Sequence, residues 1–203
     1  MIRLKQLFAT LTVVMLLLSS PALQAAVEAQ ELVIETSTRL LERLRQDQEK
    51  LQTNPELIYP LVEDLVLPHF DFERMSIWVL GKNWRKADTQ QQQQFVGAFR
   101  TLLVRTYAKA LLEYTDQELK YLPFHAEEGA KRVTVRTEIA QPGGVNIPIN
   151  YSMFLSREGQ WKVYDISVDG ISLVTNYRTS FASEIRQGGI DKLLKRLAEM
   201  NSA

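Results

Sequence analysis

The chain of 203 residues contains no cysteine and only two histidines. The lack of cysteine excludes disulfides, thiolate metal sites and thiol catalysis, so the fold must be held by packing alone. The 24 basic and 24 acidic side chains balance, which leaves no excess of positive charge to attract nucleic acid or an anionic membrane. No glycine-rich loop of the kind that binds ATP is present. These absences argue against thiol chemistry, nucleotide-driven chemistry and nucleic-acid binding.

The first 25 residues have the layout of a secretory signal peptide. Arg3 and Lys5 form a short basic start, residues 7–18 are almost continuously apolar, and Pro21 ends the run. A run of about a dozen apolar residues is too short to span a bilayer. The alternative, a buried first helix, fits poorly with two charges before the run and a proline after it. The sequence therefore predicts a cleaved signal peptide at residues 1–25 and a single exported domain at residues 26–203.

Within this domain, the spacing of apolar residues changes from helical to alternating and back again. Helices are predicted at residues 27–52, 55–67, 72–80, 89–114, 172–186 and 190–200. Strands are predicted at residues 132–139, 147–155 and 161–168, with a weaker one at 119–124. Short turns between successive strands are typical of an antiparallel meander with one buried face. The order of elements predicts the α+β class, with helices packed on an antiparallel sheet.

Few residues offer catalytic or metal-binding chemistry. His69 lies at a helix boundary where Asp71 is expected to cap the next helix, so we expect a structural or surface role for it. His125 lies among polar residues and is expected in a surface turn. Asp165 and Asp169 share a strand face but would be about 13 Å apart, too far for a pair of catalytic carboxylates, and they are expected to serve turns or ion pairs. We therefore predict no enzyme activity, no metal site and no cofactor.

The most abundant feature is an apolar strand face opposite an apolar helix face. Such faces form an ordinary close-packed core in many proteins. An exported, cysteine-free domain without catalytic groups is also suited to carrying an apolar ligand. Periodicity alone leaves both interpretations open.

Seven stretches of the chain together form a recognisable pattern, and they are Val66–Phe72, Leu80–Trp84, Phe95–Tyr107, Ile147–Tyr151, Trp161–Ile166, Gly170–Val174 and Asn176–Arg178. These stretches resemble the MlaC, or toluene-tolerance, family of periplasmic phospholipid-binding proteins. They follow the family in order over most of the mature chain, so the resemblance is stronger than a single short motif.

This resemblance implies a fold similar to nuclear transport factor 2, with helices on a curved antiparallel sheet and an apolar cavity between them. It also implies a periplasmic carrier that shuttles phospholipid between two membrane complexes and so maintains the lipid asymmetry of the outer membrane. The implied partners are an inner-membrane ABC transporter complex with an MCE domain, of which the carrier is an auxiliary component, and an outer-membrane lipoprotein–porin complex. Two acyl tails with roughly thirty methylenes would cost on the order of 20 kcal/mol to expose to water, so such a carrier needs a dry cavity.

The residues expected to line this cavity are the inward-facing strand positions, the helix face opposite them, and two positions at the mouth. They are Val135, Ile147, Ile149, Tyr151, Met153, Val163 and Ile166 on the strands, Phe99, Leu103 and Tyr107 on the helix, and Val168 and Leu173 at the mouth. Any one of them could instead be plain core.

Two other functions remain open from the sequence. A periplasmic adaptor that binds proteins would have a solid core and would purify without a ligand. A periplasmic enzyme, the weaker alternative, would need a reactive cluster around His69 or Asp165.

Overall fold

The computed structural model describes residues 21–114, 117–127 and 129–202, with no side-chain detail for residues 21–26 and 114. The α-helices are α1 (Pro21–Gln46), α2 (Gln48–Thr53), α3 (Ile58–Leu65), α4 (Phe72–Leu80), α5 (Thr89–Tyr107) and α6 (Leu173–Ser202). The short 3₁₀ helices are η1 (Pro55–Leu57), η2 (Leu67–His69), η3 (Gly81–Lys86) and η4 (Lys109–Tyr114). The strands are β1 (Leu119–Tyr121), β2 (Arg132–Ile139), β3 (Ile147–Leu155), β4 (Trp161–Val168) and β5 (Ile171–Ser172). The predicted α+β class is confirmed.

Helix boundaries follow local capping chemistry. The Asp71 carboxylate accepts the Arg74 backbone N–H at 2.8 Å and so caps α4, as predicted. Gly81 ends α4 with a φ of +52°, a conformation that favours glycine. Asp88 and Gln91 form a reciprocal capping box at the start of α5. These capping residues lie within a few residues of each helix boundary, so they can be identified from the sequence.

Three predicted helices differ in detail. The helix predicted at 27–52 is two helices, divided at Asp47, whose carboxylate pairs with Arg43 and Lys50. The one predicted at 55–67 divides into η1, α3 and the start of η2, and the one predicted at 89–114 becomes α5 and η4. Apolar spacing is compatible with either arrangement, so it could not separate a continuous helix from one with a tighter turn.

The five strands form one antiparallel sheet in sequence order, as expected for a meander. The register between β3 and β4 shifts at Ser152 and Met153. The short strand β5 is absent from the sequence prediction, which placed a helix from residue 172. It pairs with β4 through a tight turn in which Asp169 and Gly170 have φ values of +50° and +77°. The two closing helices predicted are the two arms of α6, which is broken at Gly188 and Gly189.

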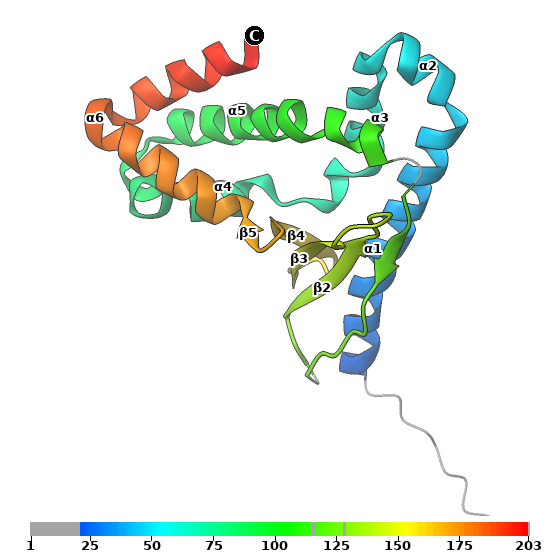
Figure 1. Ribbon diagram of the computed structural model, residues 1–203. Helices are drawn as coiled ribbons and strands as arrows, with labels where there is room; N and C mark the ends of the chain where they lie inside the picture. The colour runs from blue at the N-terminus through cyan, green and yellow to red at the C-terminus, as the bar shows by residue number, and fades with distance from the viewer. Residues whose placement is uncertain (1–20, 115–116, 128, 203) are drawn as a thin grey trace, which may run out of the picture.

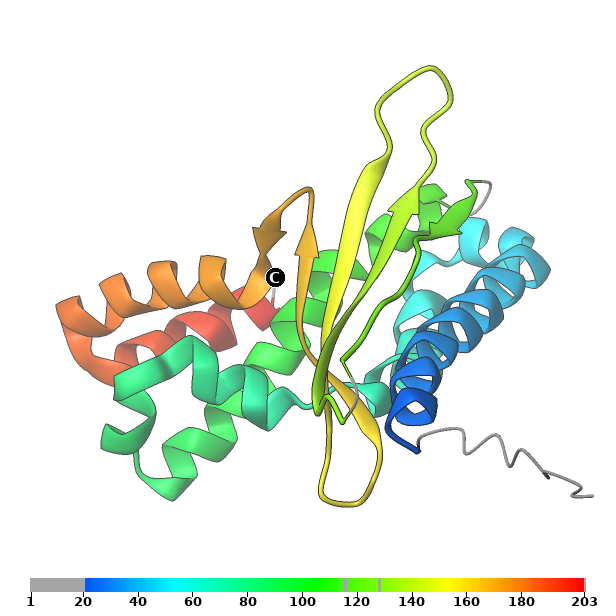
Figure 2. The ribbon, with the colours of Figure 1, turned by 90° about the horizontal axis from the view of Figure 1, so that it is seen from below.

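Figure 1 shows α1 standing along one side of the sheet, with α4 and α6 on the other side and α5 crossing above. The view from below in Figure 2 shows β3 in the middle and its connection to β2 projecting beyond the helices. Three separate clusters of buried side chains hold this arrangement. One joins α4, α5 and α6, the second joins the start of α1 to the sheet, and the third joins the rest of α1 to α2 and α3. Among the described residues, no helix is both long and apolar enough to cross a membrane.

Candidate ligand-binding cavity

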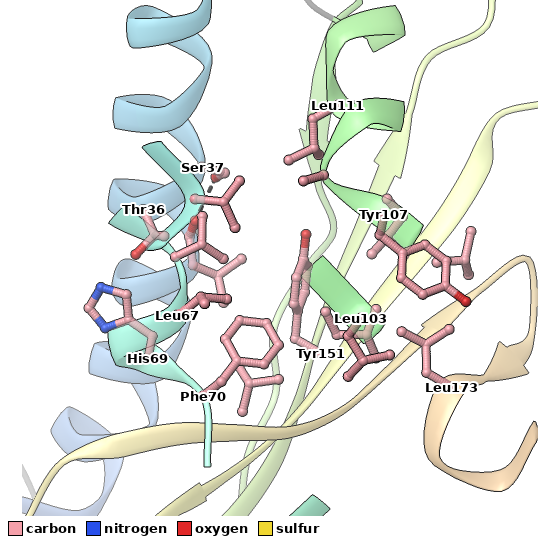
Figure 3. A pocket seen from close by; sticks show the side chains of 18 of the residues that line it. Thr36, Ser37, Leu67, His69, Phe70, Leu103, Tyr107, Leu111, Tyr151 and Leu173 are labelled. Atoms are coloured by element: carbon pink, nitrogen blue, oxygen red, sulfur yellow. Dashed lines mark hydrogen bonds between the residues drawn. The ribbon is translucent and has the colours of Figure 1, made fainter. Parts of the chain in front are cut away.

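A cavity of about 600 Å³ lies where the three clusters of buried side chains meet. Its walls come from α1, α3, η2, the start of α4, the end of α5, η4, strands β2 to β5 and the first turn of α6. Figure 3 shows Tyr151 rising from the sheet in the middle, with Thr36 and His69 on one side and Tyr107 and Leu173 on the other. The lining is mostly aliphatic and aromatic, and no Asp, Glu, Lys or Arg is among the described residues that form it. Such a space accepts apolar ligands and offers no charged group to attack or coordinate them.

Ten of the twelve residues predicted to line a cavity lie in this wall. They are Leu103, Tyr107, Ile147, Ile149, Tyr151, Met153, Val163, Ile166, Val168 and Leu173. Alternation along β3 brings its members to one face. Val163 and Ile166 of β4 are three residues apart and share that face because of the register shift, which pairs Val163 with Met153 and Ile166 with Tyr151. Their part in binding a ligand remains a prediction.

Phe99 and Val135 were predicted in the cavity wall, and the structure places them elsewhere. Phe99 has no exposed surface and packs against the rings of Phe95 and Tyr177, with centroids 5.6 and 5.3 Å away. It lies one turn before Leu103, where α6 already covers the apolar face of α5. Val135 is fully buried in the cluster that joins the start of α1 to the sheet. Both faces are apolar in the sequence, and only the packing of α1 and α6 decides which part stays uncovered.

The cavity wall formed by the first helices was not predicted from the sequence. The missed residues on this side are Leu32, Val33, Thr36, Ser37, Leu40, Val62, Val66, Leu67, His69 and Phe70. The seven-residue spacing of Val33 and Leu40 marks one face of α1, so the signal for a buried face was present. It did not show that this face covers a hollow.

One end of the cavity opens to solvent beside the turn between β4 and β5. There, Ile171 is 61% exposed, Tyr107 37% and Val168 36%, whereas Met153 is 0% exposed at the sheet. This gradient defines the mouth, which is formed by the end of α5, the β4–β5 turn and the first turn of α6. Val168 and Leu173 lie at this end, where the sequence prediction put the mouth.

The ionisable groups that line the cavity stay neutral at ordinary pH. Burial raises the pKa of the Tyr151 phenol to about 12, although a hydrogen bond with Thr137 acts in the other direction. Burial and the neighbouring Tyr177 raise the pKa of Tyr107 to about 12. Burial, followed by the nearby Lys162, lowers the pKa of His69 from its usual value. Each shift disfavours the charged form, as expected for a space with an apolar wall.

The other residues considered for chemistry have structural positions. The Asp165 carboxylate accepts hydrogen bonds from the Ser172 hydroxyl at 2.6 Å and the Val174 backbone N–H at 3.1 Å, so it caps the start of α6. Asp169 occupies the β4–β5 turn, and His125 is exposed. In the described part of the chain, no group of three His, Asp or Glu side chains could hold a metal ion.

An apolar cavity enclosed between helices and a curved antiparallel sheet defines a ligand-binding protein of the α+β class. The chain belongs to the MlaC protein family, whose sequence profile matches residues 34–199.

Named relatives and a solved structure agree with this assignment. The chain is 30% identical to the toluene tolerance protein ttg2D of Pseudomonas putida, over 87% of this chain and 82% of that protein. It is 26% identical to the intermembrane phospholipid transport system binding protein MlaC of Haemophilus influenzae, over 100% of this chain and 96% of that one. It also resembles the structure of a phospholipid-binding protein from Ralstonia solanacearum in complex with a phospholipid. That match has a TM-score of 0.78 and 33% identity and covers 86% of this chain and 97% of the other.

Proposed function

We propose that this protein is a periplasmic phospholipid carrier of the Mla system, which takes up the acyl tails of one lipid at a time in its cavity. The observation that carries the proposal is the cavity of about 600 Å³ with no charged residue in its described wall. Membership of the MlaC family and the phospholipid bound to the Ralstonia protein support the same function. A solid-core adaptor is not favoured, because the core of this protein is hollow.

The proposed carrier exchanges lipid with an inner-membrane ABC transporter complex that has an MCE domain, and with an outer-membrane lipoprotein–porin complex. The name of the Haemophilus relative, an intermembrane phospholipid transport system binding protein, supports such partners. Transfer requires no catalytic group and no cofactor, only partners that bind the loaded and empty forms with different affinities. The neutral, apolar wall is suited to this role, since it stabilises a lipid tail without reacting with it.

Mass spectrometry of the lipid that copurifies with the protein tests the proposal. Protein prepared without detergent should release about one diacyl phospholipid per chain on organic extraction. An extract that contains no lipid, from folded protein, would contradict the proposed function.

Three glutamate substitutions locate the cargo within the molecule. Ile149 is half-buried and lines the cavity, so Ile149→Glu should fold, admit water and lose its lipid. Val145 is 89% exposed and outside the cavity wall, so Val145→Glu should retain normal lipid.

Met153 is 0% exposed, and Met153→Glu should lower the free energy of unfolding by more than about 4 kcal/mol, because the new carboxylate would have neither water nor a hydrogen-bond partner. Denaturant unfolding and lipid extraction distinguish the three results, and a folded Ile149→Glu that retains lipid would exclude this cavity as the binding site.

A further inference from the structure

Two polar side chains lie at the mouth of the cavity, beside wall residues that are apolar. Tyr107 is the last residue of α5, and Asn176 is in the first turn of α6. Both line the cavity and both are exposed. The neighbouring wall residues Val168, Ile171 and Leu173 have no polar side-chain atom. A ligand whose apolar part fills the cavity would therefore place its polar end beside Tyr107 and Asn176 where it reaches solvent.

The mouth is held rigidly. The Tyr177 ring packs against Phe99 and Phe181, with both centroid distances 5.3 Å, and Tyr177 lies close enough to Tyr107 to raise the pKa of its phenol. The cap provided by Asp165 fixes the start of α6 to the sheet. Figure 3 shows the Tyr107 hydroxyl on the Leu173 side of the cavity, away from Thr36 and His69. Side chains that are already fixed in this way lose little conformational entropy when they bind a ligand.

Several hydrogen-bond donors at the mouth are unused. The Tyr107 and Tyr177 phenols interact, because Tyr177 raises the pKa of Tyr107, and at most one of their two hydroxyl protons can be engaged between them. The Asn176 amide has two N–H donors with no acceptor among the described side chains and backbone atoms. The Tyr107 phenol keeps its proton at neutral pH, because burial and the neighbouring Tyr177 raise its pKa to about 12.

We propose that Tyr107, Tyr177 and Asn176 form a hydrogen-bonding site for the phosphodiester of the bound lipid, at the mouth of the cavity. The proposal rests on the carrier function above and adds to it a recognition site. The two unesterified oxygens of a phosphodiester are acceptors and are present in every diacyl glycerophospholipid that has a head-group alcohol. Because the described cavity wall has no charged side chain, this site distinguishes a phospholipid from a lipid without phosphate, and not one head group from another.

A competition experiment tests the site. Delipidated protein is offered dioleoyl phosphatidylglycerol and dioleoylglycerol, which have the same tails, and the bound ratio is measured by mass spectrometry. The wild type should prefer the phospholipid, and Tyr107→Phe and Asn176→Ala should each lower that preference about tenfold. Leu173→Ala is the matched control at the same mouth: it removes apolar contact and should weaken both lipids equally. Inorganic phosphate should displace neither lipid, since it has no tail to occupy the cavity.

The outcomes separate the site from the carrier function. If the wild type binds both lipids equally, or the variants keep its ratio, the mouth site is wrong and the carrier function stands. If the wild type binds neither lipid, the carrier function fails and the site with it. Displacement by inorganic phosphate would show a general anion site and overturn the assignment to lipid. Tyr177→Phe keeps the ring in its aromatic cluster and provides the same test if another variant does not fold.

Discussion

Single residues at the cavity wall show how burial controls charge. His69 was expected in a structural or surface position, and it lies half-buried in the cavity wall as the last residue of η2. Lys162 lies close by and donates a hydrogen bond to the backbone oxygen of Pro68 at 2.8 Å. Glu35 and Arg39 of α1 also face the imidazole, with opposite effects on its charge. Burial and Lys162 dominate, so the neutral imidazole is favoured.

This environment predicts a stability loss in acid that depends on His69. The folded chain holds the pKa of His69 below its ordinary value of 6.5, so the unfolded chain binds a proton first as the pH falls. Stability is therefore unaffected above this ordinary pKa and declines as the pH drops through it. Melting curves between about pH 7.5 and pH 5.5 should show a larger loss for the wild type than for His69→Gln. Parallel losses in the two proteins would contradict this origin of the acid sensitivity.

Among the structural elements, helices α5 and α6 each contain a glycine, one in regular helical backbone and the other with a positive φ. Gly189 has a φ of +77° at the break in α6, where a side chain is strained. Gly97 lies inside α5, is exposed, and has nothing within 4 Å of the position a Cβ would occupy. The break lets the second arm of α6 turn back, so that Leu193 and Leu197 are buried in the same cluster as Phe95.

These positions predict stability changes of opposite sign for the same substitution. Gly97→Ala should stabilise the protein by about 0.5–1 kcal/mol, because alanine restricts the unfolded chain and suits a helix. Gly189→Ala should destabilise it by about 1–2 kcal/mol, because a Cβ disfavours the left-handed region. Urea unfolding measures both values. Equal effects at the two sites would show that the break in α6 does not require glycine.

At the scale of the whole molecule, the packing of α1 is relevant to removal of the predicted signal peptide, because the predicted cleavage site lies near the start of this helix. The signal peptide predicted at residues 1–25 lies mostly outside the described residues, although α1 begins at Pro21. Val27 is 42% exposed, and Ala29 is 0% exposed against the sheet. Among the described side chains, the buried contacts between α1 and the sheet begin at Ala29, which is part of the mature chain if cleavage follows residue 25.

We expect the mature protein to begin at Ala26, or at Val27 if the cut falls one residue later. The physical reason is that a signal peptidase cuts after a small residue that follows a short apolar run. Intact-mass measurement of protein taken from the cell envelope checks the position. An intact Met1 on that protein would exclude cleavage, and with it the proposed route of export.

Some features of this protein were determined by the sequence alone because their causes are local. The caps at Asp71 and Asp88, the stop at Gly81 and the break before Ile190 each depend on residues within one or two turns. The meander follows from short turns between alternating segments, and the period of two brings the predicted wall residues of β3 to one face of the sheet.

Other features were decided only by the tertiary structure. Apolar periodicity identifies a face that is buried from solvent, but the pattern is the same whether a packed helix or a cavity lies opposite that face. Phe99 and Val135 are apolar and inward-facing like Leu103 and Tyr151, yet other elements pack over the first two and leave the second two at the cavity. Which side chains meet the hollow depends on how far α1 and α6 extend over the sheet, and that distance is set by contacts between segments far apart in the chain.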